Sequence, residues 1–163
     1  MSVKWSLRSL IDKKYADLSP QELLDVPVSA IKGVSERDAE LLKQAFNIKT
    51  IRDLADNKYV KIAQAITSLA DFWEEALDKA FEKKSPKELV NAPVSAISGV
   101  SERDAELLKQ AFNIKTVKDF ATQKYILIAQ IIKTLAILQP LIEEAAREAM
   151  KEEAKKTEEK ETK

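Results

Sequence analysis

The chain has 163 residues, with 27 Lys plus Arg balanced by 27 Asp plus Glu, and it contains two Gly, no Cys and no His. The missing residue types exclude disulfides, thiolate or imidazole metal sites, and nucleophilic catalysis of the Ser-His-Asp or Cys-His kind. Two glycines are too few for a glycine-rich nucleotide loop. We therefore expect no enzyme activity, no metal and no cofactor. With a net charge of zero, the chain also lacks the excess of basic residues that most DNA-binding domains carry.

An internal duplication organises the chain. Residues 20–70 align with residues 86–136 at an offset of 66 without gaps, and 36 of the 51 aligned positions are identical. Residues 34–50 and 100–116 carry the same string, VSERDAELLKQAFNIKT. A repeat of this length predicts two copies of one helical module.

Each copy opens with the start signals of a short helix. The string Ser19-Pro20-Gln21-Glu22 places an N-cap serine before a proline at the first helical position and a glutamate at the third, which predicts a capping box. The string Ser85-Pro86-Lys87-Glu88 repeats this pattern. The residue before a proline avoids helical angles, so we expect this helix to end near Pro27 or Pro93. The PVSAI string that follows predicts a short turn or a single helical turn.

A longer helix follows in each copy. Gly33 and Gly99 open the connection, and the string Ser35-Glu36-Arg37-Asp38 predicts a second cap. The apolar positions after that cap recur at helical spacing and predict a core-facing stripe. Asn47 comes after this helix and favours a left-handed C-terminal turn. Thr50 then repeats the capping pattern and predicts another short helix.

Two long helices are predicted next. Residues 58–84 contain neither Gly nor Pro, which indicates one long helix or two abutting helices that join the modules rigidly. The matching segment of the second copy runs to Pro140, which we expect to kink or end it. Residues 125–142 are the most apolar stretch, but Lys133 lies at their centre. We therefore predict a buried helix and no membrane partner.

The two ends of the sequence are rich in charge. Residues 1–18 are too charged and too broken in pattern for a signal peptide, and we expect a cytoplasmic protein. Residues 151–163 consist almost entirely of Lys, Glu and Thr, which predicts a tail that is frayed or disordered.

The hairpin region of each copy resembles a known family. The string IKGVSERDA at residues 31–39, the following Leu42 and the string AFNIKTIRDLA resemble the helix-hairpin-helix family, and residues 97–121 resemble it again. The resemblance implies that the hairpin's backbone N–H groups bind a DNA phosphate, without sequence specificity, helped by the N-terminus of the next helix. The residues it implies are Gly33, Val34, Ser35, Gly99, Val100 and Ser101, with Arg37 and Arg103 neutralising phosphates.

The same residues also fit a structural interpretation. The position of the family's second glycine is occupied by Ser35 and Ser101. Ser35 as an N-cap with Asp38 as its partner accounts for the string without a ligand. Glu36 and Asp38 stabilise a helix from its first turn, but they repel phosphate at the same place. Both interpretations stay open at this point.

The two copies differ on their last helix. Lys61, Ala65 and Asp71 of the first copy become Leu127, Ile131 and Ile137 of the second, so the later helix is apolar on more of its circumference. A helix that is apolar nearly all round must be buried. Either residues 141–150 fold back over it, or another subunit covers it. Leu127, Ile131 and Ile137 are therefore the predicted protein interface.

Together these patterns predict an all-α fold of two tandem helix-hairpin-helix-like modules, joined by a long shared helix and followed by a C-terminal helix. The modules are residues 1–72 and 73–150, and residues 151–163 are the tail. Our first functional hypothesis is a non-enzymatic interaction or structural protein that gives bivalent binding or self-assembly with a protein partner. The second is nucleic-acid binding through the two hairpins. We expect no small-molecule substrate.

Overall fold

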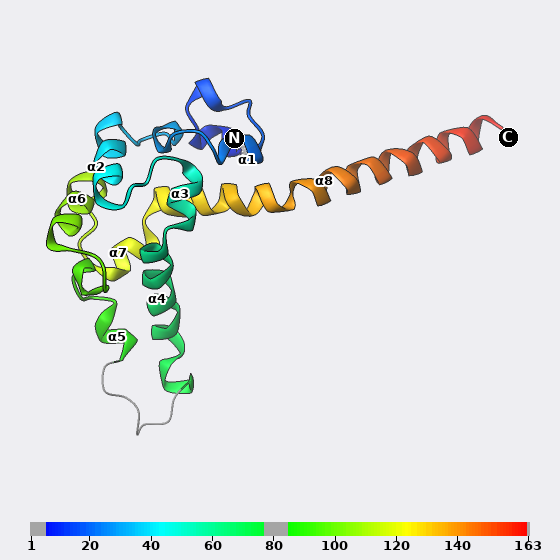
Figure 1. The fold of residues 1–163 in the computed structure, drawn as a ribbon. Coiled ribbons are helices and arrows are strands. Elements are labelled where there is room, and N and C mark those ends of the chain that lie inside the picture. The colour runs from blue at the N-terminus through cyan, green and yellow to red at the C-terminus, as the bar shows by residue number, and fades with distance from the viewer. Residues whose placement is uncertain (1–5, 77–84, 163) are drawn as a thin grey trace, which may run out of the picture.

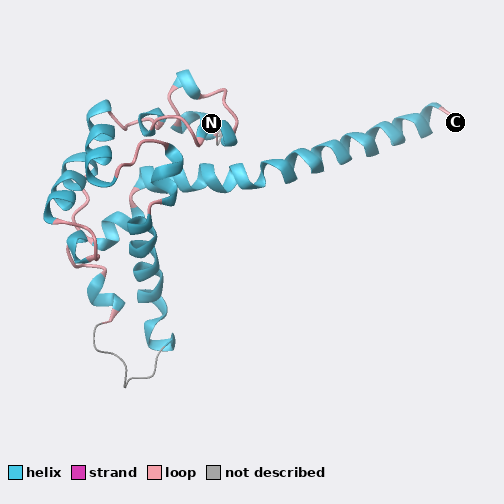
Figure 2. Cartoon of the chain, viewed as in Figure 1, coloured by secondary structure: helices cyan, strands magenta, loops and turns pink. Residues whose placement is uncertain are grey.

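The computed structural model describes residues 6–76 and 85–162. Helices dominate this part of the chain, and it contains no β-strand, so the predicted all-α class is confirmed (Figure 2). Four short 3-10 helices are η1 (Leu7–Leu10), η2 (Lys13–Tyr15), η3 (Val28–Ala30) and η5 (Val94–Ala96). The α-helices are α1 (Pro20–Leu23), α2 (Glu36–Phe46), α3 (Ile51–Asp56), α4 (Lys58–Ala76), α5 (Pro86–Leu89), α6 (Glu102–Phe112), α7 (Val117–Thr122) and α8 (Lys124–Glu161).

The predicted capping boxes form at five helix starts. The side chain of the N-cap residue accepts a hydrogen bond from the third helical residue, whose carboxylate accepts one from the N-cap amide in return. These N-caps are Ser19, Ser35, Thr50, Ser101 and Thr116. The box predicted at Ser85 is wrong, because within the described residues its side chain makes no capping hydrogen bond. Pro86 does occupy the first turn of α5, as expected.

The predicted turn residues also take up their special backbone angles. Gly33 and Gly99 both have a φ of 96°. Asn47 and Asn113 end α2 and α6 in the left-handed conformation, with φ of 57° and 55°. These four positions are fixed by local chemistry, since Gly and Asn are the residues that tolerate positive φ best.

The long helix of each repeat packs on the other repeat. Helix α4 packs on α5 and α7, which belong to the second copy, and α8 packs on α1 and α3, which belong to the first. The identical helices α2 and α6 pack on each other (Figure 1). Because these helix contacts recur with the copies exchanged, the two repeats interlock about an approximate two-fold axis, in the manner of an isologous dimer.

A pair of glutamines marks this axis. Gln64 and Gln130 are equivalent residues of the two copies, and each donates a side-chain hydrogen bond to the other, at 2.7 and 2.8 Å. Gln64 also donates to the carbonyl of Ala121. Around the pair, one continuous core draws fully buried aliphatic and aromatic side chains from both copies, among them Leu42, Leu108 and Phe120.

Helix α8 leaves the body and projects away from it (Figure 1). Its first part is buried on one side, through Ile126, Ala129, Ile132 and Ala136, and residues 141–161 are exposed. The prediction of a wholly buried helix is therefore wrong, and so is the prediction that residues 141–150 fold back over it. Residues 151–161, predicted to fray, lie in the same helix.

Pro140 lies inside α8, so of the two outcomes expected at this residue, a kink or an end of the helix, the end is wrong. A proline in a helix lacks the N–H that would bond the carbonyl four residues earlier, here that of Ala136. The side chain of Gln21 in α1 donates a hydrogen bond to that carbonyl, at 3.3 Å. The backbone N–H of Gln21 donates to the side chain of Gln139, also at 3.3 Å. Helix α1 thus supplies the partner that proline removes, and the helix continues.

Some predictions fall outside the described residues. The predicted helix over residues 58–84 is seen as α4 up to Ala76, and its part over residues 77–84 lies outside them. Helix α5 packs back against α4, so the two described elements on either side of that segment lie side by side.

Candidate functional site

The hairpin amides are the first candidate site. In the first copy, the N–H of Val34 donates to the carbonyl of Ile31 at 3.1 Å, and the N–H of Ser35 donates to the Asp38 carboxylate at 3.1 Å. In the second copy, Val100 and Ser101 repeat these bonds to Ile97 and Asp104, at 3.0 and 3.1 Å. Two of the three amides that the family resemblance implies as phosphate donors are thus already bonded within each hairpin.

The third amide of each hairpin belongs to a glycine that is exposed but lies against a tyrosine of the other repeat. The hydroxyl end of Tyr125 lies so close to Gly33 that a Cβ atom there would clash with it. Tyr59 lies against Gly99 in the same way, with its hydroxyl 2.7 Å from the place of a Cβ. Each tyrosine also contacts a phenylalanine of its own repeat, Phe46 or Phe112, at ring-centroid distances of 4.8 and 5.0 Å. Both glycines therefore serve the packing between the copies.

Acidic groups surround both hairpins. Arg37 and Arg103 are exposed in the first turns of α2 and α6, where each has a glutamate on one side and an aspartate on the other. The aspartate carboxylate occupies the amide end of the helix, which is the place that an anion would take. The site therefore offers a phosphate one guanidinium against two carboxylates in each copy.

A similar capping box lies at the start of α7, where the carboxylate is that of Asp119. Burial raises the pKa of Asp119, but hydrogen bonds from the Thr116 and Lys115 amides outweigh this effect and lower the pKa below its ordinary value. Both amides donate at 3.1 Å. The charged carboxylate is therefore part of the cap.

The second candidate site is the exposed face of α8. Leu127 and Ile131, two of the three predicted interface residues, lie on it together and are 40% and 50% exposed. They line a shallow open groove with Gln130, Thr134 and Leu135. Isolated exposed apolar residues are ordinary, but a contiguous row on one helix indicates an interaction surface.

Ile137, the third predicted interface residue, lies on a neighbouring face of α8. It is 66% exposed, and it borders a shallow pocket shared with α1 and α3, whose polar members include Gln21, Asp25 and Arg52. The structure therefore brings together Leu127 and Ile131, and it separates them from Ile137.

The apolar face extends further along α8 than predicted. Leu138, Leu141 and Ile142 are 40%, 61% and 57% exposed and follow Ile131 at helical spacing. The alternation of three- and four-residue steps through these positions was the available signal, and it was missed because Pro140 was expected to kink or end the helix. We call this row the α8 stripe, and its exposed members are Leu127, Ile131, Thr134, Leu138, Leu141, Ile142, Ala145 and Ala149.

Helix α4 provides an internal comparison for this surface. It occupies the equivalent place in the first copy and makes the equivalent packing contacts. Its residues at the first three stripe positions are Lys61, Ala65 and Ser68, all exposed. At these three positions the first copy therefore folds without a large apolar residue, so packing of the body does not account for Leu127 and Ile131.

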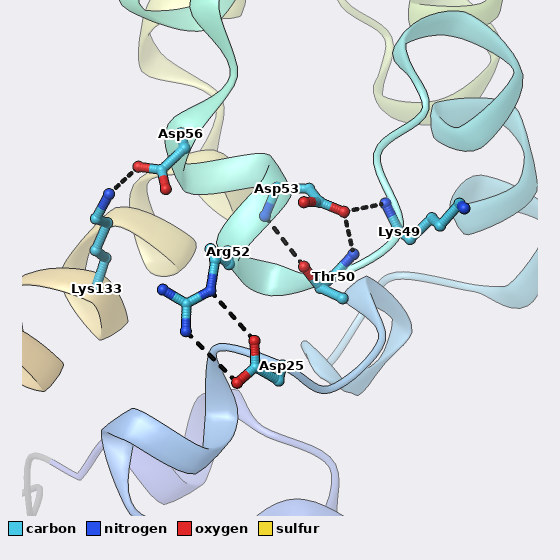
Figure 3. A network of polar contacts seen from close by, with 7 residues as sticks. All are labelled: Asp25, Lys49, Thr50, Arg52, Asp53, Asp56 and Lys133. Atoms are coloured by element: carbon cyan, nitrogen blue, oxygen red, sulfur yellow. Dashed lines mark hydrogen bonds and ion pairs between the residues drawn. The ribbon is translucent and has the colours of Figure 1, made fainter.

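A polar network holds α8 in place from its other side (Figure 3). Lys133 of α8 bonds to the Asp56 carboxylate at the end of α3. Arg52 of α3 donates to Asp25 at 3.2 Å, and this hydrogen bond raises the pKa of the Arg52 guanidinium. These contacts fix one side of α8 against α1 and α3 and leave the α8 stripe facing outward.

Comparisons with known proteins add no family to this picture: no family model, no curated protein and no solved structure matches the chain. Within residues 6–76 and 85–162, no three His, Cys, Asp or Glu side chains are grouped to hold a metal ion. By length and composition alone, α8 is apolar enough to cross a membrane: its most apolar window of 18 residues has a mean hydropathy of 1.7 and is 22% buried.

Proposed function

We propose that this chain is a non-enzymatic helical interaction protein that binds a partner helix through the α8 stripe. The observation that carries the proposal is the difference between α4 and α8. The two helices make equivalent packing contacts in the two repeats. At equivalent exposed positions, α8 has Leu127 and Ile131 and α4 has Lys61 and Ala65. A rigid helix that displays an apolar row is a standard means of binding another helix.

The hairpins support nucleic-acid binding less well. That function comes from the family resemblance, and two of the three amides it would use are bonded to Ile31 and Asp38 in the first copy and to their equivalents in the second. A phosphate would have to displace a carboxylate from the helix end in each copy. We therefore assign the hairpins to packing and capping in this proposal.

The experiment compares three versions of the tagged full-length chain in extracts of cells that express it. These are the wild type, the stripe variant Leu127→Lys/Ile131→Ala, which installs the residues of α4, and the control Ile62→Ala/Leu69→Ala, which removes exposed apolar residues from α4. Size-exclusion chromatography after mild cross-linking measures the complexes.

We expect the wild type and the control to elute in a complex larger than the 18.3 kDa chain, and the stripe variant to lose it. Circular dichroism of the purified variants checks that their helix content is retained. Elution of all three at the size of the single chain would overturn the proposal. A stripe variant that keeps the complex would overturn it as well.

A further inference from the structure

We infer that the helix bound by the α8 stripe is α8 of a second copy of this chain, packed antiparallel. This inference rests on the proposed function and names the partner of the same surface. The stripe follows the heptad rule, since Leu127, Ile131, Thr134, Leu138, Leu141 and Ala145 are separated by alternating steps of four and three residues. Such a seam is what two helices use to pack against each other.

The length of the stripe suits a helix pair. From residue 127 to residue 149 an α-helix rises about 33 Å at 1.5 Å per residue, or about three heptads. All eight positions of the stripe are exposed, and the outer ones belong to residues 141–161, which are exposed throughout as α8 projects from the body (Figure 1). A second helix therefore has a clear face on which to lie.

The sizes of the stripe residues favour the antiparallel direction. The two ends of the stripe differ in size, with Leu127 and Ile131 at the end near the body and Ala145 and Ala149 at the far end. In an antiparallel pair centred on Leu138, residue 127 faces residue 149 and residue 131 faces residue 145, so Leu127 and Ile131 each meet an alanine. Between them, Leu138 meets the Leu138 of the second copy, and Ile142 meets Thr134. A parallel pair would place large on large at one end and alanine on alanine at the other, which packs unevenly.

The charges at the ends of the stripe favour the same direction. The same register sets Lys124 opposite Glu152, and both side chains are exposed. In a parallel pair Glu152 would face Glu152, and Lys156, the next residue along the stripe, would face Lys156. Opposite charges across a helix seam set its orientation, and like charges oppose it.

The surroundings of α8 argue against a lipid bilayer as the occupant. Lys133 lies within the apolar segment and is held by Asp56, and the side of α8 that carries Ala129 and Ile132 is buried in the body. The segment cannot cross a bilayer without giving up this packing and taking a lysine into the hydrocarbon.

The first measurement is the mass of the purified full-length chain by sedimentation equilibrium over a range of concentrations. We expect a reversible dimer of about twice the 18.3 kDa chain. Leu138→Lys places two lysines at the centre of the pair and should raise the dimer Kd at least about tenfold. The control Ile62→Lys puts the same charge on exposed α4 and should leave the dimer Kd unchanged.

Disulfide trapping tests the direction, because the natural chain has no Cys. Ala145→Cys alone should not cross-link, since the two sulfurs of an antiparallel pair lie about 21 Å apart along the helix axis. A mixture of Ala145→Cys and Ile131→Cys chains should give the mixed disulfide. Cross-linking of Ala145→Cys with itself would overturn the antiparallel arrangement.

The outcomes separate this inference from the proposed function. A purified chain that is monomeric at every concentration overturns the inference, and a stripe-dependent complex in extract would then leave the proposed function standing with a different protein as partner. Absence of both overturns both. Stripe-dependent flotation of a monomeric chain with neutral phosphatidylcholine vesicles would identify a membrane as the occupant and also overturn the inference.

Discussion

Gly33 and Gly99 combine two demands that usually occur separately. Each has a φ of 96°, and each lies against a tyrosine of the other repeat, Tyr125 or Tyr59. Any residue other than glycine would therefore meet backbone strain and a steric clash at once. In each copy, the glycine that opens the hairpin therefore also packs against the other repeat.

Gly33→Ala should lower the free energy of unfolding by about 2 kcal/mol or more, since the backbone angle alone costs about 1–2 kcal/mol for a residue with a Cβ. Urea denaturation measures the loss. Adding Tyr125→Phe removes the hydroxyl that the new methyl meets, so the double variant should lose less than the sum of the single variants. Strictly additive losses would show that the tyrosine plays no part.

Asp119 predicts a pH dependence of stability. Its pKa is lowered in the folded state because amide hydrogen bonds outweigh burial, so the charged carboxylate stabilises the fold above the unfolded pKa of about 4. That contribution disappears as the pH falls through the lower folded pKa. Asp119→Asn should therefore destabilise the chain at pH 7 and cost less at pH 2–3. Urea denaturation at both pH values checks this, with exposed Glu144→Gln as the control for loss of a charge. An equal cost at both would contradict it.

At the scale of the elements, capping made most helix starts predictable. The boxes at Ser35 and Thr50 need only residues three apart, and the left-handed Asn47 needs only its own backbone preference. The partners of the helices were not predictable in this way. Because the two copies share long identical strings, α4 and α8 present similar faces to either copy, and local sequence does not say which copy each one packs on.

The course of α8 shows a second limit of local patterns. A proline usually ends a helix, and the sequence around Pro140 has no feature that contradicts this. The helix continues because Gln21, 115 residues earlier, bonds the carbonyl of Ala136. This contact exists only after the repeats have exchanged their long helices, so it could not be read from the pattern. The same error hid the outer part of the α8 stripe.

Gln21→Ala should lower the free energy of unfolding by about 1 kcal/mol, the usual value of one net hydrogen bond, because the Ala136 carbonyl loses its partner. Pro140→Ala provides the matched background, since alanine restores the N–H that bonds this carbonyl within the helix. There the cost of Gln21→Ala should shrink. Urea denaturation of the four chains gives the coupling. An unchanged cost in the Pro140→Ala background would mean that Gln21 acts through other contacts.

At the scale of the whole molecule, the repeated residues act mainly in the contacts between the two copies. They do not present the same interaction surface twice. The paired contacts Gln64–Gln130 and α2 on α6 use repeated residues. The residues that differ include core positions such as Leu54 and Phe120, and on the exposed faces of α4 and α8 they exchange Lys61 and Ala65 for Leu127 and Ile131. This difference explains how two similar repeats form one body in which α8 carries an exposed apolar stripe. The interaction surface that we propose lies on the part of α8 that departs from the repeat.

We also predict that the hairpins do not bind DNA. Two of the three candidate amides in each hairpin are bonded internally, and the first turns of α2 and α6 carry Glu36, Asp38 and the equivalent acids. The net charge is zero, so few counterions would be released on binding. Fluorescence anisotropy with labelled single- and double-stranded DNA at about 50 mM salt should show no binding at micromolar protein.

The matched variant Asp38→Asn/Asp104→Asn removes the two carboxylates that occupy the helix ends, and it tests whether they are what excludes phosphate. If it gains binding that weakens between about 50 and 200 mM salt, the hairpins retain a phosphate site that the aspartates close. The wild type itself could instead bind in that salt-dependent way, with Arg37→Glu/Arg103→Glu abolishing the binding. Phosphate would then displace the capping carboxylates from the hairpin amides. The hairpins, and not α8, would then be the functional surface.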